Sequence, residues 1–216
     1  MATGSVRARV DLGRLIMIPS AVLMLVLDSA SLTHHPADGI VTALRWLGLA
    51  GVCAFYTLII WSYLRRGPAV ATTRSATAHV AAVAATCAPF AIPLLRATSP
   101  GPARQLAADV LLLAGTAWAV WSLRFLGRNL SVLAQARDVV DHGPYRWIRH
   151  PLYAGEIVSA LGLAIAAGSA AAAGLWLALC ALQAYRALRE EQVLLGALPG
   201  YRAYRTRTAA LLPGIF

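Results

Sequence analysis

The sequence predicts an all-α protein, a polytopic bundle of helices embedded in a membrane. The chain is 59% hydrophobic, only 13% charged, and has a mean hydropathy of +0.64. A soluble domain carries about twice that charged fraction. Several apolar runs also approach the roughly 20 residues that a helix needs to cross a bilayer. At this length, residues 1–216 form a single membrane domain, with no room for a separate soluble domain of ordinary size.

Five apolar blocks follow one another along the chain, and polar or turn-forming residues separate them. They cover residues 12–33, 40–64, 76–96, 104–126 and 152–185. Each is long enough for a membrane helix. Pro89 and Pro93 should kink or loosen the third block, because proline removes a helical hydrogen bond.

The fifth block is too long for one ordinary span, and the sequence Ala-Gly-Ser at residues 167–169 falls near its middle. Two arms of about 16 residues would each reach ~24 Å, slightly less than a full bilayer core. We therefore expect a tight helical hairpin that dips most of the way through the membrane. Its many Ala and Gly residues allow the two arms to approach closely.

The positive charge of the chain comes entirely from arginine, since the sequence contains no lysine and its net charge is +10. The arginines cluster at the ends of apolar blocks, so they indicate topology and no nucleic-acid partner. All but Arg45, Arg96 and Arg104 fall on one side of the predicted membrane. The positive-inside tendency then predicts that both termini are cytoplasmic. The lack of lysine and abundance of alanine favour a GC-rich genome and a bacterial plasma membrane.

The cysteines and histidines do not form a metal-binding pattern. Cys53, Cys87 and Cys180 lie inside apolar blocks and read as small buried hydrophobic residues. No histidine has a second ligand at metal spacing, so we expect no metal site.

A polar and aromatic stretch, HGPYRWIRHPLYAGE at residues 142–156, joins the fourth and fifth blocks. Residues 141–144 form a turn signal, and Pro151 suits the first turn of the following helix. With Arg149 and His150 beside it, this helix N-terminus suits an anionic or electron-rich ligand group. The alternative is an interfacial anchor, because Tyr, Trp and Arg are common at head-group depth.

A second polar region, residues 185–216, follows the hairpin. Glu190 and Glu191 are adjacent acids in a chain with three glutamates. After a turn at residues 198–200, tyrosines and arginines follow at near-helical spacing, so the tail is amphipathic. We expect this tail to lie along the membrane surface and against the 142–156 loop. The alternative is an ordinary solvated helix end.

Taken together, three motifs closely resemble the isoprenylcysteine carboxyl methyltransferase family. They are GPYRWIRHPLYAG, the EE pair and PGYRAYRTRTAALLPGIF. Its relatives include phospholipid N-methyltransferases and small-thiol S-methyltransferases of membranes. The resemblance covers about residues 120–216, including LGRNLS ahead of the loop. It divides the domain into N-terminal spans of unknown role, residues 1–100, and a methyltransferase-like core, residues 101–216.

The resemblance implies an integral-membrane enzyme of the EC 2.1.1 class that uses S-adenosylmethionine. Its cofactor pocket would be non-Rossmann and cytoplasmic, and the chain indeed lacks a GxGxxG motif after a strand. Carried over by motif, the cofactor-binding residues would be Tyr145, His150, Pro151, Tyr153, Gly155, Glu190, Glu191, Tyr201, Tyr204 and Arg205.

The resemblance also suggests Glu190, Arg149 and Arg207 as catalytic residues. Methyl transfer is an in-line displacement, so the enzyme mainly aligns the reactants and excludes water. A carboxylate acceptor needs no base, and Arg207 or Arg149 could hold it. An amine or thiol acceptor must lose a proton, for which Glu190, Glu191 and His150 are the candidates.

The expected acceptor is a lipophilic small molecule or a lipid that enters from the bilayer. It could carry a carboxylate, as in isoprenylcysteine carboxyl methylation, or the amine of a phospholipid or small molecule, or a thiol. A function of another class is a non-catalytic membrane scaffold or transporter subunit. No inverted repeat supports a transporter, and the sequence does not indicate the oligomeric state.

Overall fold

The computed structural model describes residues 12–31, 39–73 and 75–211 of the chain. The all-α expectation is confirmed, because the only strands in these residues are two short ones. The helices are α1 (Leu12–Ser31), α2 (Gly39–Arg65), α3 (Ala76–Ala91), α4 (Pro102–Leu126), α5 (Pro151–Ala167), α6 (Ala170–Ala197) and α7 (Tyr201–Arg205). The 3₁₀ turns are η2 (Ile92–Leu95), η3 (Gly127–Asn129) and η4 (Gly143–Arg146), and the strands are β1 (Ala71–Thr72) and β2 (Gln135–Ala136).

Four of the described helical segments are long and apolar enough to cross a membrane. They are Trp46–Arg65, Ala76–Leu95, Pro102–Asn129 and Ala170–Ala197, and two shorter apolar helices, Gly13–Val26 and Pro151–Ala167, accompany them. The five predicted blocks correspond to these helices, with the fifth divided into α5 and α6. The chain therefore has the architecture of a polytopic membrane bundle.

The third block loosens where its prolines predict. Ser75 caps α3, since its Oγ accepts a hydrogen bond from the backbone N–H of Ala78 at 3.3 Å. The helix contains Pro89 and passes into the 3₁₀ turn η2 after Ala91, with Pro93 at the start of that turn. The missing proline donors explain this change of helix type.

The hairpin turns at the predicted place, but its second arm is longer than predicted. Gly168 ends α5 with a left-handed φ of 63°, and the hydroxyl of Ser169 caps α6 by accepting from Ala172 N–H at 3.0 Å. The expectation of two arms of equal length is wrong, because α6 has 28 residues and α5 has 17. The residues after 185 continue the helix because Ala, Leu, Arg, Glu and Gln all favour helix formation. The helix ends just before Pro199 and Gly200, which do not favour it.

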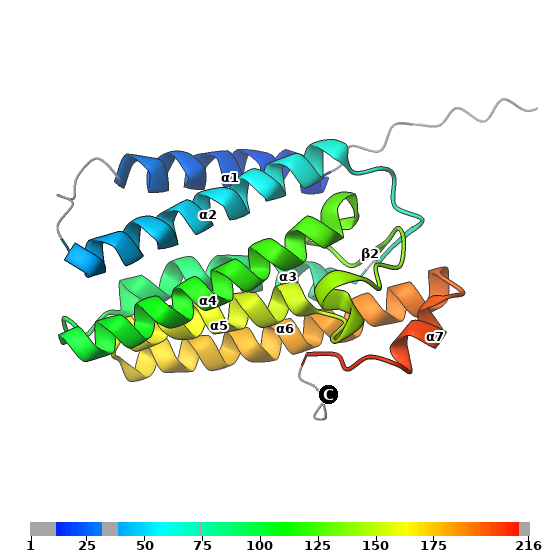
Figure 1. The fold of residues 1–216 in the computed structure, drawn as a ribbon. Helices are drawn as coiled ribbons and strands as arrows, with labels where there is room; N and C mark the ends of the chain where they lie inside the picture. Colours follow the sequence, from blue (N-terminus) through cyan, green and yellow to red (C-terminus); the bar gives the residue numbers. More distant parts are fainter. Residues whose placement is uncertain (1–11, 32–38, 74, 212–216) are drawn as a thin grey trace, which may run out of the picture.

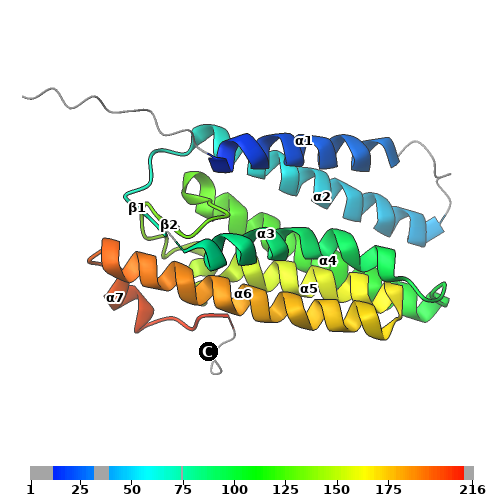
Figure 2. The same cartoon turned by 180° about the vertical axis from the view of Figure 1, so that it is seen from behind.

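The helices form two groups that meet along α4. In Figure 1 α1 and α2 lie side by side above α4, α5 and α6 lie below it, and α3 lies behind it and packs on α6. The short elements β1, β2 and α7 gather at one end of the bundle, as both views show (Figures 1 and 2). We call this the polar end.

Small residues allow α4 and α5 to pack with their backbones almost in contact. A Cβ atom added to Gly115 would lie 2.4 Å from the backbone N of Ser159, and one added to Gly155 would lie 2.8 Å from the carbonyl O of Gly115. A Cβ atom added to Gly162 would lie 2.6 Å from the carbonyl O of Ala108. Any larger side chain at these positions would push the two helices apart.

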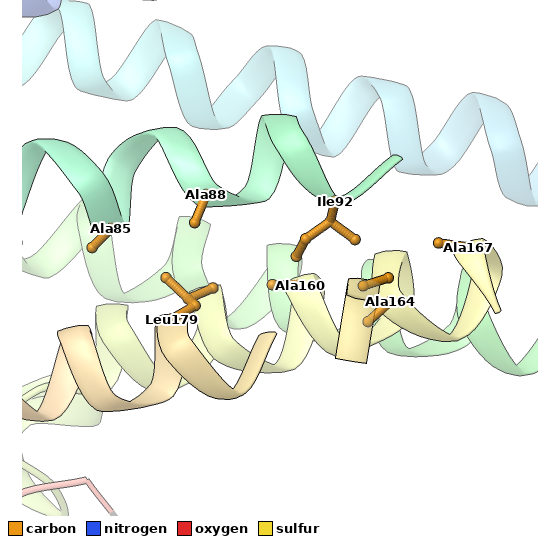
Figure 3. Close-up of a cluster of buried hydrophobic side chains, with 8 residues drawn as sticks. Ala85, Ala88, Ile92, Ala160, Ala164, Ala167 and Leu179 are labelled. Atoms are coloured by element: carbon orange, nitrogen blue, oxygen red, sulfur yellow. The ribbon is translucent and has the colours of Figure 1, made fainter. Parts of the chain in front are cut away.

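Alanine also dominates the core between α3, α5 and α6, as Figure 3 shows for one buried cluster. Its members are Ala85, Ala88, Ile92, Ala160, Ala164, Ala167, Ala172 and Leu179. A second cluster, around Tyr63, Leu123 and Leu130, joins α2 to α4 and the segment after it.

A two-residue antiparallel ladder closes the polar end. Ala71 pairs with Ala136 and Thr72 with Gln135, so the segment after α2 is tied to the segment after α4. Arg137 adds a hydrogen bond from its Nε to the carbonyl of Gly67 at 3.2 Å. These contacts fix the polypeptide that precedes the 142–156 loop.

Candidate active site

The loop between α4 and α5 presents its side chains through a tight turn. Gly143 takes a φ of 60°, and Phe125 lies so close that a Cβ atom would be 2.6 Å from its ring. The following turn η4 buries Tyr145. Pro151 then starts α5, and its carbonyl accepts a hydrogen bond from Trp118 Nε1 at 2.9 Å, which anchors the helix start to α4.

The C-terminal tail folds back against this loop, as its amphipathic pattern predicts. The backbone N–H groups of Arg149 and His150 donate to the carbonyls of Ala209 and Ala210 at 2.8 and 3.0 Å. The hydroxyl of Tyr204 donates to the carbonyl of Tyr145 at 2.7 Å. The loop and the tail thus form one unit beside the end of α6.

Glu191 is the centre of a buried ionic cluster. Its Oε1 accepts from Arg149 Nε at 2.6 Å and lies 3.3 Å from His150 Nε2, while its Oε2 lies 3.1 Å from Arg205 Nε. The Glu191 side chain is only 6% exposed and that of Arg149 9%. Arg149 also donates to the carbonyls of Arg205 and Thr208. Both oxygens of this carboxylate are therefore committed to protein partners.

Glu190 has fewer partners and a more open position. Its Oε2 accepts a hydrogen bond from Tyr153 Oη at 2.9 Å and lies 3.7 Å from His150 Nδ1. Its side chain is 24% exposed. The His150 and Tyr153 rings are stacked, with their centres 5.4 Å apart and their planes nearly parallel. The two side chains that face Glu190 therefore also pack against each other.

Tyr201 carries a buried hydroxyl with no hydrogen-bond partner among the described residues. The residue is 3% exposed. Burial raises its pKa, and the carboxylates of Glu191 and Glu190 add to this. Burial likewise raises the pKa of Tyr145 and Tyr204. All three are neutral at ordinary pH, and Tyr201 has a donor available for a ligand.

A small pocket opens beside Glu190, between α3, α6 and the segment before β2. Glu190, Tyr153, Arg186 and Arg189 supply its polar lining. Ala78, Ala82, Val132 and Ala134 supply the rest. The polar wall comes from the hairpin α5–α6, and the apolar wall comes from α3 and the segment before β2.

Two of the predicted site residues lie apart from this cluster. Gly155 is buried against Gly115 and Ala119 of α4, where it serves helix packing. Arg207 is exposed at the end of the α7 turn, and its Nε donates to the carbonyl of Ala203 at 3.1 Å. The other predicted residues meet at the polar end.

Three polar residues outside the predicted catalytic and cofactor-binding set lie directly behind it; Glu156 was expected from its position one turn into the hairpin, and Gln183 and Arg186 were missed. Gln183 and Arg186 are buried on α6, and Glu156 faces them from α5. The sequence did contain a signal for the two residues of α6, because Gln183, Arg186 and Glu190 are spaced along one face of a helix. No described residues form a cluster of three or more His, Cys, Asp or Glu side chains that could hold a metal ion.

The sequence was compared with known families and structures. Residues 103–197 match the family model described as phospholipid methyltransferase. The expected similarity to membrane methyltransferases is confirmed over this range, which is less than half of the chain. The match starts earlier than the predicted residue 120 and ends before the tail. Its segment contains α4, the loop, the hairpin and both acids.

No curated protein matches the sequence. Among solved structures, that of the eukaryotic intramembrane Ras methyltransferase ICMT, isoprenylcysteine carboxyl methyltransferase, is similar at 18% identity and a TM-score of 0.47. The alignment covers 96% of this chain and 87% of that one.

Proposed function

We propose that this chain is an integral-membrane enzyme that transfers a methyl group from S-adenosylmethionine to a lipophilic acceptor. One observation carries the proposal. The acid pair meets Arg149, His150, Tyr153 and the hydroxyl of Tyr201, which has no partner among the described residues, at one end of an apolar bundle. Both acids and the hairpin also fall within the segment similar to phospholipid methyltransferases.

The side chains suit the chemical groups of this cofactor, which are an ammonium, a carboxylate, a sulfonium and an adenine. Of the two adjacent acids, Glu190 has the more open carboxylate and would pair with the ammonium. Arg205, whose side chain is 49% exposed, would pair with the carboxylate. Tyr201 would donate its hydroxyl, and the stacked pair of Tyr153 and His150 would line the site. When bound, the cofactor supplies an activated methyl group on its sulfonium.

The remaining residues of the proposed site would shape it. Glu191 would hold Arg149 and Arg205 in place, since both of its oxygens are engaged. Tyr204 would fix the loop through the carbonyl of Tyr145. Pro151 and Gly155 would set the start of α5 against α4.

The acceptor decides which residues would assist the transfer. For an amine or a thiol, Glu190 is the most accessible of the proposed bases and would take the proton. For a carboxylate, no base is needed, and a guanidinium would hold the acceptor in line. Arg149 is already bound to Glu191 and to two carbonyls, so it would have to exchange these contacts to do so. Arg207 is exposed and lies apart from the cluster, so it would have to turn toward the acceptor.

We further infer that the polar end faces the cytoplasm, in a bacterial plasma membrane. The arginine distribution along the sequence supports this orientation. The acceptor would then reach the site from the bilayer while the cofactor enters from the aqueous side.

Binding of S-adenosylhomocysteine by the purified protein in detergent, measured by calorimetry, tests the proposal. We expect the wild type to bind and Glu190→Gln to bind about tenfold or more weakly, because a charge-assisted contact to the ammonium is lost. Asp138→Asn, at an exposed ion pair with Arg128, is the matched control and should bind normally. Absence of any binding by the wild type would refute the proposal. Incubation with methyl-labelled cofactor and total membrane lipids would then identify the labelled acceptor.

A further inference from the structure

Three polar side chains lie between α5 and α6, about one to two helical turns deeper in the bundle than the acid pair. They are Glu156, Gln183 and Arg186, and we call them the buried triad. Gln183 is 1% exposed and Arg186 8% exposed. The surrounding hairpin is otherwise rich in alanine and leucine, so a charged pair at this depth requires an explanation.

Gln183 connects the two charges of the triad. Its Nε2 donates to Glu156 Oε2 at 2.6 Å, and its Oε1 accepts from Arg186 Nη1 at 2.9 Å. The amide therefore presents its donor to the carboxylate and its acceptor to the guanidinium. This arrangement compensates both charges and fixes the rotamer of Arg186.

Arg186 in turn contacts Tyr153 of the proposed site and lines the small pocket beside Glu190. Its guanidinium carbon lies 4.6 Å from the centre of the Tyr153 ring, and its Nη2 donates to the carbonyl of Val132 at 3.2 Å. The hydroxyl of Tyr153 then donates to Glu190 at 2.9 Å. A continuous series of contacts thus runs from Glu156 to Glu190.

We propose that Gln183 and Arg186 are positioning residues for cofactor binding, acting through Tyr153 on Glu190. The inference rests on the proposed function and deepens it. Glu156 neutralises Arg186 through Gln183, and Arg186 holds the face of the Tyr153 ring. The ring orientation then fixes the carboxylate of Glu190. Buried ionic groups contribute little net stability compared with apolar side chains of similar size, whereas an oriented ligand-binding group gains affinity from preorganisation.

The first experiment compares Gln183→Met with Trp176→Phe. Methionine matches the length of glutamine but leaves Glu156 and Arg186 unconnected. Trp176→Phe removes another hydrogen bond across the same hairpin, from its Nε1 to the carbonyl of Ile157 at 3.0 Å, without touching the triad. We expect Gln183→Met to weaken S-adenosylhomocysteine binding about tenfold and Trp176→Phe to leave it unchanged. Equal affinities for Gln183→Met and the wild type would overturn the inference.

A second experiment separates positioning from general destabilisation. In the Tyr153→Phe background, which lacks the hydroxyl that reaches Glu190, Gln183→Met should cause no further loss of affinity. Losses that simply add would overturn the inference. If Gln183→Met does not fold, Arg186→Lys gives the same comparison, because lysine keeps the charge but cannot reach Gln183, Val132 and the Tyr153 ring together. A wild type that binds no ligand would overturn both this inference and the proposed function, whereas a binding wild type with additive losses overturns only this one.

Discussion

The helices α1 and α2 and the hairpin α5–α6 are similarly apolar, but they use their apolar residues differently. In α1 and α2 large side chains point outward, among them Leu15, Leu23, Trp46, Leu47, Trp61 and Leu64. Along the α4–α5 contact and in the hairpin core, small residues are buried instead, such as Gly115, Gly155, Ala160 and Ala164. Bulk suits a surface that contacts lipid, while small residues bring helix backbones together.

The polar chemistry follows the second pattern. Every residue of the acid cluster and the buried triad lies on α5, α6 or the segments packed against their ends. Close packing on α4 fixes the start of α5, and hydrogen bonds between loop and tail fix the end of α6. The comparison suggests that α5–α6 is organised for chemistry and that α1 and α2 present a lipid-facing surface.

The largest effect should come from the acid cluster. Glu191→Ala would leave Arg149 buried without its carboxylate, at a cost of about 3 kcal/mol in the free energy of unfolding. Asp138→Ala breaks an ion pair at 3.8 Å whose side chains are 66% and 72% exposed; it should cost less than about 1 kcal/mol. Denaturant or thermal unfolding in detergent measures both. Equal losses would show that the buried cluster contributes no more to the free energy of unfolding than an exposed ion pair does.

The next effect tests the close contact between α4 and α5. Gly115→Ala would bring a Cβ within 2.4 Å of the Ser159 backbone N, which forces the helices apart. We expect a loss of about 1–3 kcal/mol. Gly174→Ala is the matched control, since nothing lies within 4 Å of a Cβ there. If both glycines tolerate alanine equally, the small-residue interpretation of this contact is wrong.

The two tail tyrosines should separate stability from ligand binding. Tyr204→Phe removes the hydrogen bond to the Tyr145 carbonyl and should lower stability by about 1 kcal/mol. Tyr201→Phe removes a hydroxyl without a described partner, so stability should hold while S-adenosylhomocysteine binding weakens. Burial raises the pKa of both groups. Below the ordinary tyrosine pKa of about 10 the wild-type stability should therefore not depend on the titration of these groups, and it should fall as the pH rises further, because folding disfavours their ionised forms. A Tyr201→Phe variant that binds normally would remove this residue from the proposed site.

The smallest effect should come from the outward face of α2. Leu47 is 62% exposed, so Leu47→Ala should change the free energy of unfolding by less than about 0.5 kcal/mol. The same unfolding assay measures it. A loss as large as that of Gly115→Ala would mean that another part of the protein or a second chain covers this face.

Sequence patterns predicted the helices well, because composition and local turn chemistry determine them. Gly168 and Ser169 end one helix and cap the next, as a turn in an alanine-rich hairpin requires. The prolines predicted that the third block loosens, and there α3 passes into a 3₁₀ turn. The length of α6 was missed, since a change from apolar to charged residues marks the edge of a membrane and does not end a helix.

The sequence by itself determined the class of the protein, its spans and the segments that carry its polar chemistry. Only the tertiary structure distinguished the saturated carboxylate of Glu191 from the open one of Glu190, although the two are adjacent in the chain. It also assigned Gly155 to helix packing and joined Glu156, Gln183 and Arg186 behind Tyr153. The physical reason is that helix periodicity gives the face on which a side chain lies, whereas its partners depend on which helix packs against that face and in what register.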